Sequence, residues 1–302
     1  MASEHIAPAW RSLKSRLIVG FSLFGVFLAA LWLGGLAWAF LMAFASFLAA
    51  RELVLMMHQA RLARPLLPVL IVFGMALMLA GLRGKTSWFM PTLTLAVVGT
   101  FLGVLLRGLA MPKTKLPQSG ALADIGATLV VLFYLAFLPA HYLLLRLLGG
   151  QSLGLGYVLF TALVVMASDI GAYAFGKWLG RTPLLSAISP KKTREGALGG
   201  LFFALLVGLT AGPACGIKTT HVLILGSLLV LAAQLGDLVE SMMKRDAGVK
   251  DTGVLLKAHG GVLDRIDSWL FAAPLAYYYI EWVVLRQGWL WNEAIPFLQK
   301  QF

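Results

Sequence analysis

Long apolar runs constrain this chain more than any other feature. Nine of them alternate with more polar stretches, at residues 17–33, 35–50, 66–82, 87–106, 121–145, 153–175, 197–214, 220–240 and 266–286. A helix of about 20 apolar residues crosses the roughly 30 Å hydrocarbon core of a bilayer. The sequence therefore predicts an all-α, polytopic integral membrane protein with about nine transmembrane helices.

The composition supports this class and limits the kinds of partner that we expect. Of the 302 residues, 60% are hydrophobic and 13% are charged, whereas soluble domains are about 25% charged. The net charge of +12 does not require nucleic acid, because Lys and Arg in polytopic proteins mark the cytoplasmic side and attract anionic lipids. We therefore expect membrane lipids and no nucleic acid as partners. The single cysteine, Cys215, excludes a disulfide framework within the chain.

The distribution of basic residues predicts the orientation. With a cytoplasmic N-terminus, 19 of the 25 Lys and Arg residues fall in cytoplasmic segments, as the positive-inside rule requires. Residues 1–16 resemble the start of a signal peptide, but no cleavage site follows, so the first run is expected to remain as a span. The C-terminus then lies outside, and the polar loops 176–196 and 241–265 face the cytoplasm from the cytoplasmic (inner) membrane.

Acidic residues are concentrated in the second half of the chain. Eight of the 13 Asp and Glu residues lie between residues 169 and 267. Carboxylates in or beside spans cost about 2.5–3.5 kcal/mol on insertion scales and usually face a partner or a wet cavity. We therefore expect residues 1–150 to form a scaffold in contact with lipid and residues 151–302 to form the catalytic region. The carboxylates concerned are Asp169, Asp237, Asp264 and Asp267.

Four carboxylates close together need a cation. Carboxylates, hydroxyls and carbonyls favour Mg²⁺, with Mn²⁺ as the next choice and a second ion left open. The spacing of Asp237, Glu240, Ser241 and Lys244 at i, i+3, i+4 and i+7 places them on one helix face.

Basic residues and glycines accompany these acids in both cytoplasmic loops. A cation together with Lys and Arg is the equipment for phosphoryl or nucleotidyl transfer, and Gly248 and Gly253 let the backbone approach phosphate. No Walker motif occurs, so a nucleotide is not expected to be held by a P-loop. The basic residues are Lys191, Lys192, Lys244, Arg245, Lys250 and Arg265, whereas Arg194 and Lys257 are interpreted as positive-inside charge alone.

The segment 168–180 combines a polar face with small residues. Asp169, Tyr173 and Lys177 are spaced along one helix face, and Gly171 and Gly176 lie close by. Small residues at such spacing usually serve tight helix packing in lipid. Packing does not explain Asp169.

Two blocks of sequence point to one family. Residues 236–268 contain Ser-x-x-Lys-Arg, four residues, Lys-Asp, and then His-Gly-Gly and Asp-Arg-x-Asp; the second block is SDIGAYAFGK with SPKKTREGALGG. Together they resemble the phosphatidate cytidylyltransferases, the CDP-diacylglycerol synthases. The resemblance implies a membrane nucleotidyltransferase of phospholipid biosynthesis that transfers CMP from CTP to phosphatidate and releases pyrophosphate.

The resemblance also implies roles for residues. Asp237 and Asp264 would bind the metal, with Asp267 close to them. Dimers are common in this family, so a homodimer is a further expectation. The catalytic set would be Lys244, Arg245, Arg265 and Asp267, and the substrates would contact Asp169, Lys191, Lys192, Thr193, Ser241, Lys250, His259, Gly260 and Gly261.

One departure from the family pattern leaves alternatives open. Lys257 and Ala258 stand where the family usually has Pro-Gly before His-Gly-Gly, so another lipid phosphate could be the acceptor. A CTP-dependent lipid kinase would use the same residue types, and an ion or phosphate transporter could also place carboxylates in spans. A CDP-alcohol phosphotransferase is disfavoured because its Asp-Gly-x-x-Ala-Arg motif is missing.

Overall fold

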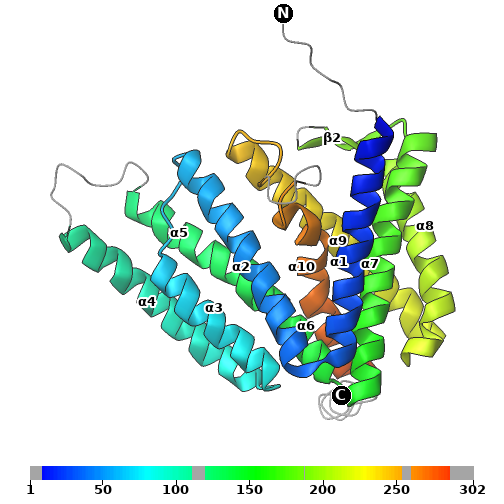
Figure 1. Ribbon diagram of the computed structural model, residues 1–302, viewed down its shortest axis with the longest axis horizontal. Helices are drawn as coiled ribbons and strands as arrows, with labels where there is room; N and C mark the ends of the chain where they lie inside the picture. The colour runs from blue at the N-terminus through cyan, green and yellow to red at the C-terminus, as the bar shows by residue number, and fades with distance from the viewer. Residues whose placement is uncertain (1–8, 111–119, 187, 254–259, 286–302) are drawn as a thin grey trace, which may run out of the picture.

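The structure is a computed structural model that describes residues 9–110, 120–186, 188–253 and 260–285, and in this part the chain is almost entirely helical (Figure 1). Two π-helical segments, η3 (Phe133–Phe137) and η6 (Ile280–Leu285), join α5 to α6 and extend α10. The α-helices are α1 (Ala9–Leu33), α2 (Gly35–Gln59), α3 (Leu67–Leu82), α4 (Phe89–Ala110), α5 (Gly120–Leu132), α6 (Leu138–Leu147), α7 (Gln151–Leu179), α8 (Arg194–Ala211), α9 (Thr219–Asp246) and α10 (Leu263–Tyr279).

Several of these segments suit a membrane. Among the described residues, six helical segments are long and apolar enough to cross a membrane, whereas the helices Gly20–Leu33 and Leu67–Leu82 are apolar but shorter. The prediction of a nearly all-α chain with membrane-spanning helices is therefore confirmed, while the count of nine and the orientation of the termini remain predictions. The six are Gly35–Gln59, Thr86–Ala110, Gly120–Leu147, Gln151–Leu179, Arg194–Ala211 and Thr219–Asp246.

Glycine pairs make the tightest connections between helices. Gly34 and Gly35 have φ angles of 62° and 48°, and Gly149 and Gly150 have φ angles of 66° and 89°. Residues with a side chain rarely adopt such angles, so glycine lets the chain reverse without a long loop. As a result α1 packs beside α2, and α6 packs beside α7.

Helices α9 and α10 lie at the centre of the assembly. Figure 1 shows them between α2 on one side and α7 with α8 on the other, and α10 contacts α2, α6, α7 and α9. The main core combines aliphatic and small side chains such as Val164 and Ala273, both fully buried, with aromatic ones such as Trp38 and Phe160. Large apolar side chains such as Phe40 and Leu109 point outward, which suits lipid and is unusual over a large area in soluble proteins.

Small residues bring α7 and α8 into close contact. A Cβ atom on Gly171 would lie 2.8 Å from the Gly199 carbonyl oxygen, and one on Gly196 would lie 2.8 Å from the Ala172 carbonyl oxygen. A larger residue at either position would force the helices apart. The expected packing role of the small residues in segment 168–180 is thereby confirmed.

A short hairpin between α7 and α8 is the departure from helix that the sequence did not predict. Strands β1 (Pro183–Leu185) and β2 (Ser189–Thr193) pair antiparallel, with Pro183 opposite Thr193 and Leu185 opposite Ser189. The Thr193 hydroxyl accepts a hydrogen bond from the Gly196 N–H at 3.1 Å and so caps the start of α8. The cap fixes the end of β2, and with it the polar loop that the sequence had singled out.

Candidate active site

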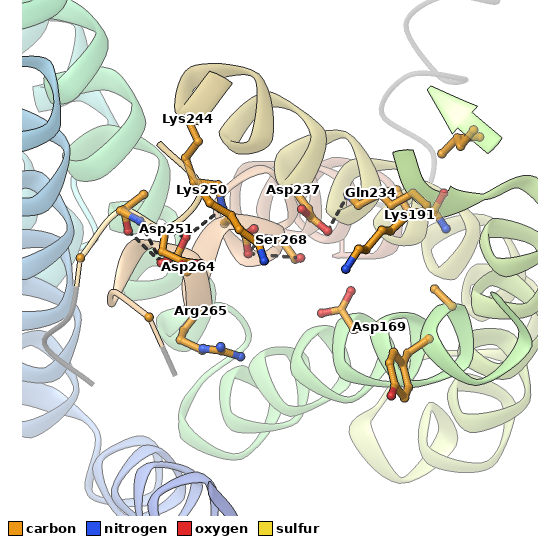
Figure 2. A pocket seen from close by; sticks show the side chains of 18 of the residues that line it. Asp169, Lys191, Gln234, Asp237, Lys244, Lys250, Asp251, Asp264, Arg265 and Ser268 are labelled. Carbon is orange, nitrogen blue, oxygen red and sulfur yellow. Dashed lines mark hydrogen bonds and ion pairs between the residues drawn. The ribbon is translucent and has the colours of Figure 1, made fainter. Parts of the chain in front are cut away.

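One cavity of about 1370 Å³ collects most of the residues predicted to form a site. It is lined by α2, α7, the start of α8, α9, α10, the hairpin and the segment that follows α9. Figure 2 shows charged side chains from several of these elements pointing into the same space. Both sequence blocks therefore meet here, with Asp169, Lys191, Lys192, Thr193, Asp237, Lys244, Lys250, Gly260, Asp264, Arg265 and Asp267 among the lining residues.

Three carboxylates form the acidic centre of this site. Oxygen atoms of Asp237 and Glu240 on α9 and of Asp267 on α10 all lie within 4.8 Å of one another. Glu240 is fully buried and Asp267 is 8% exposed. Lys244 forms an ion pair with Glu240 at 2.5 Å, but within the part of the chain that the structure describes neither Glu240 oxygen accepts a hydrogen bond of good geometry. Three close carboxylates repel one another, so this donor set fits a hard divalent cation.

Asp264 is held differently from these three acids. One of its oxygens accepts a hydrogen bond from Lys244 at 2.8 Å, and the other accepts from the Gly261 N–H at 2.8 Å and from the Thr252 hydroxyl at 3.1 Å. Burial would raise the pKa of Asp264, but the bonds from Lys244 and Gly261 outweigh burial and hold this pKa below its ordinary value. Asp264 is therefore an ionised anchor for the segment around it.

The hairpin and α7 form another wall of the cavity. Lys192 on β2 reaches across to Asp237 on α9, with 2.6 Å between Nζ and Oδ2. Asp169, Tyr173 and Lys177 all line the cavity from α7, so their predicted common face is the one turned toward the site.

Other predicted site residues lie beside the cavity. The Ser241 hydroxyl donates to Asp237 at 3.5 Å, which fits the predicted common face on α9. Arg245 is exposed and donates to the Val249 carbonyl at 3.5 Å, and among the described residues it does not line the cavity. Gly261 contributes its N–H to Asp264. His259, with Lys257 and Ala258, lies outside the described residues.

Helix α2 supplies lining residues that sequence reasoning missed. Arg51, Glu52, Met56 and Gln59 reach the cavity from the part of the chain interpreted as scaffold. Glu52 accepts hydrogen bonds from the N–H groups at the start of α10. The available signal was an Arg-Glu pair just beyond a predicted span, but nothing in the spacing connects it to the later acids.

Comparisons with known proteins give the relatives of this chain. The cytidylyltransferase family matches residues 14–283. A phosphatidate cytidylyltransferase of Mycobacterium bovis is 33% identical over 283 residues, covering 92% of this chain and 89% of that protein. One of Synechocystis sp. is 44% identical over 193 residues, covering 54% of this chain and 64% of that protein. One of Staphylococcus aureus is 48% identical over 127 residues, covering 41% of this chain and 49% of that protein.

Proposed function

The chain belongs to the cytidylyltransferase family, and on that premise we propose that it transfers CMP from CTP to phosphatidate, giving CDP-diacylglycerol and pyrophosphate. One observation carries the proposal: a single cavity holds a cluster of carboxylates surrounded by Lys and Arg side chains. Phosphoryl and nucleotidyl transfer depend mainly on positioning and charge neutralisation, and this cavity offers both.

The reaction balances without a strong base. A phosphate oxygen of phosphatidate attacks the α-phosphorus of CTP and forms the new P–O bond. The bond from the α-phosphorus to the oxygen shared with the β-phosphate breaks, and its electron pair leaves with pyrophosphate. A phosphate monoester has a second pKa of about 6, so the attacking oxygen is already largely ionised at neutral pH.

Basic side chains on two sides of Asp237 suit two anionic substrates. In Figure 2, Lys250 and Lys191 lie on opposite sides of Asp237. Lys244, Lys250 and Arg265, from the loop block, would neutralise the triphosphate and the departing pyrophosphate. Lys191 and Lys192, from the hairpin, would hold the second phosphate.

A divalent cation, Mg²⁺ or Mn²⁺, would be held by Asp237, Glu240 and Asp267. This choice rests on the proximity of their oxygens and on the burial of Glu240, whose one close cation among the described residues is Lys244. Such an ion polarises the α-phosphate and neutralises charge. The assignment of Asp264 as a ligand remains a prediction, because its oxygens accept hydrogen bonds from Lys244, Gly261 and Thr252. A second ion is not required by this set.

The orientation follows from the distribution of basic residues. With nine spans, a cytoplasmic N-terminus and an outside C-terminus, both polar loops face the cytoplasm, where CTP is made available. The protein would then work in the cytoplasmic membrane with its cavity open to the cytoplasm. A homodimer is an expectation that rests on the family resemblance alone.

Labelled CTP separates the proposed reaction from its alternatives. Purified protein in detergent, with Mg²⁺ and phosphatidate, should move label from α-labelled CTP into lipid and leave γ-label in pyrophosphate. Label entering lipid only from the γ-position would instead identify a lipid kinase. If neither label moved with phosphatidate or other lipid phosphates, the enzymatic proposal would be wrong. Comparing phosphatidate with other lipid phosphates also tests whether the Lys257–Ala258 departure from the family pattern changes the acceptor.

A further inference from the structure

Helix α2 carries a buried carboxylate that the proposed chemistry does not use. Glu52 is 5% exposed. Its two oxygens accept hydrogen bonds from the N–H groups of Val262 at 3.0 Å and Leu263 at 2.9 Å. The Thr252 hydroxyl also contacts it, at 3.4 Å. A residue of the N-terminal half thus binds the segment that connects α9 to α10.

These contacts cap α10. The first N–H groups of a helix have no partner within the helix, and a carboxylate there interacts favourably with the helix dipole. Val262 is the N-cap residue of α10, and its own side chain makes no capping hydrogen bond. Glu52 therefore supplies from α2 what the local sequence lacks.

The same contacts reach the substrate side of the loop. The Thr252 hydroxyl lies between two carboxylates, 3.4 Å from Glu52 and 3.1 Å from Asp264. A Cβ atom on Gly253 would lie 2.9 Å from a Glu52 oxygen, and one on Gly261 would lie 2.5 Å from the other. The glycines thus allow the loop backbone to lie directly against the Glu52 carboxylate.

We propose that Glu52 is a positioning residue for the reaction: by binding Thr252, Val262 and Leu263, it holds Asp264 and Gly260 at the CTP side of the cavity. This inference rests on the proposed function. The donors to Glu52 are the backbone N–H groups of Val262 and Leu263 and the hydroxyl of Thr252, which lie on either side of Gly260 and Gly261. Its contacts therefore serve the loop rather than general cohesion between helices.

Glu52→Gln provides the test. The glutamine has almost the same size, but it turns one acceptor oxygen into an NH₂ donor that faces backbone N–H groups. We expect KM for CTP to rise at least tenfold and kcat to fall at least tenfold, both measured per folded enzyme. Trypsin should also cut after Lys250 several times faster in the folded variant, because the nearby Thr252 is released from Glu52.

Asp124→Asn is the matched control. Asp124 is another buried acid of the N-terminal half, 1% exposed and paired with Arg107 away from the cavity. This variant should lose folded protein while KM for CTP stays within twofold and trypsin cleavage after Lys250 is unchanged. The same profile in Glu52→Gln would overturn the inference, as would unchanged kinetics.

Two further experiments cover the cases in which Glu52→Gln does not fold or the wild-type protein is inactive. If Glu52→Gln does not fold, Thr252→Val removes the hydroxyl between the two carboxylates without altering a membrane helix, and it should raise KM for CTP several-fold. An unchanged KM would then count against the inference. If the wild-type protein has no cytidylyltransferase activity, the proposed function fails, but the trypsin comparison still decides whether Glu52 holds the loop.

Discussion

Lys192 on β2 and Asp237 on α9 form an ion pair across the cavity, with 2.6 Å between Nζ and Oδ2. The two side chains are 27% and 34% exposed, so water screens the pair only in part. The contact joins the hairpin after α7 to the acidic centre of the site. It also keeps an ammonium group beside the carboxylates, where an anionic substrate would bind.

Replacing Lys192 by Ala should reduce kcat/KM about ten- to a hundredfold. A hydrogen bond to a charged group is worth about 1.5–3 kcal/mol, and each 1.4 kcal/mol corresponds to about tenfold. The neighbouring Arg194→Ala is the control, since Arg194 is exposed and outside the described lining of the cavity. It should change kcat/KM less than about twofold. Equal losses in both variants would mean that only the general charge of the loop matters.

Asp267→Asn should reduce activity by more than about a hundredfold, because it removes a charge from the buried carboxylate group proposed to hold the cation. It should also weaken Mn²⁺ binding, measured by paramagnetic resonance on the purified protein. Asp246→Asn, at the exposed end of α9, should leave both unchanged. Normal Mn²⁺ affinity in Asp267→Asn would contradict this cation site.

Asp264→Asn should also abolish activity while the protein stays folded. The same Mn²⁺ measurement distinguishes the two possible causes of this loss, which are removal of a metal ligand and release of the loop. If Asp264 is a metal ligand, as the family resemblance implies, Mn²⁺ binding should weaken as much as in Asp267→Asn. If Asp264 mainly anchors Thr252 and Gly261, Mn²⁺ binding should be kept and KM for CTP should rise. Full activity would remove both roles.

The helices were predictable because lipid imposes long apolar runs, and each run is long enough to be recognised without knowledge of its neighbours. The hairpin was not, because strand β2 reads Ser-Pro-Lys-Lys-Thr and shows no alternation of apolar and polar residues. Its position depends on the Thr193 cap and on the Glu195 carboxylate, which accepts hydrogen bonds from the N–H groups of Arg181 and Thr182. Those contacts are specific to the folded chain.

The site was predictable where its residues are close in sequence. Asp237 and Lys244 share a helix face by spacing alone, and both line the cavity. Spacing also placed Glu240 on the face of Asp237, but it could not reveal that Asp267 joins these two acids, because that grouping depends on how α10 packs against α9. Glu52 was missed for the same reason: its partners lie about 200 residues away, and only the packing of α2 on the loop brings them together.

Gly261→Ala should reduce activity at least tenfold. A Cβ atom there would lie 2.4 Å from the Thr252 hydroxyl and 2.5 Å from a Glu52 oxygen, so the segment would have to move and would disturb the N–H that binds Asp264. Gly248→Ala is the comparison, with a φ of +69° but open space around it. It should cost only about 1–2 kcal/mol of stability for the left-handed backbone and keep its activity. Gly261 has no left-handed φ, so a comparable loss of activity in both variants would mean that crowding against Thr252 and Glu52 is not the cause.

The two ends of α9 should lie on opposite sides of the membrane. The helix runs from Thr219 to Asp246, and 28 residues at about 1.5 Å each exceed the hydrocarbon thickness. Lys218 and Lys250 flank it, and both are exposed. Single cysteines at these two positions, in a chain whose buried Cys215 is replaced by Ala, can be tested with a membrane-impermeant maleimide.

In intact cells whose cell envelope lets the maleimide reach the outer face of the cytoplasmic membrane, the cysteine replacing Lys218 should react and the one replacing Lys250 should not. In inside-out vesicles the pattern should reverse, and in detergent both should react, which controls for burial. The reason is that Lys250 lines the cavity and CTP reaches it from the cytoplasm. Labelling of Lys250→Cys in intact cells would place the cavity on the wrong side for its nucleotide. Reaction of both cysteines from one side would instead mean that α9 does not span the membrane.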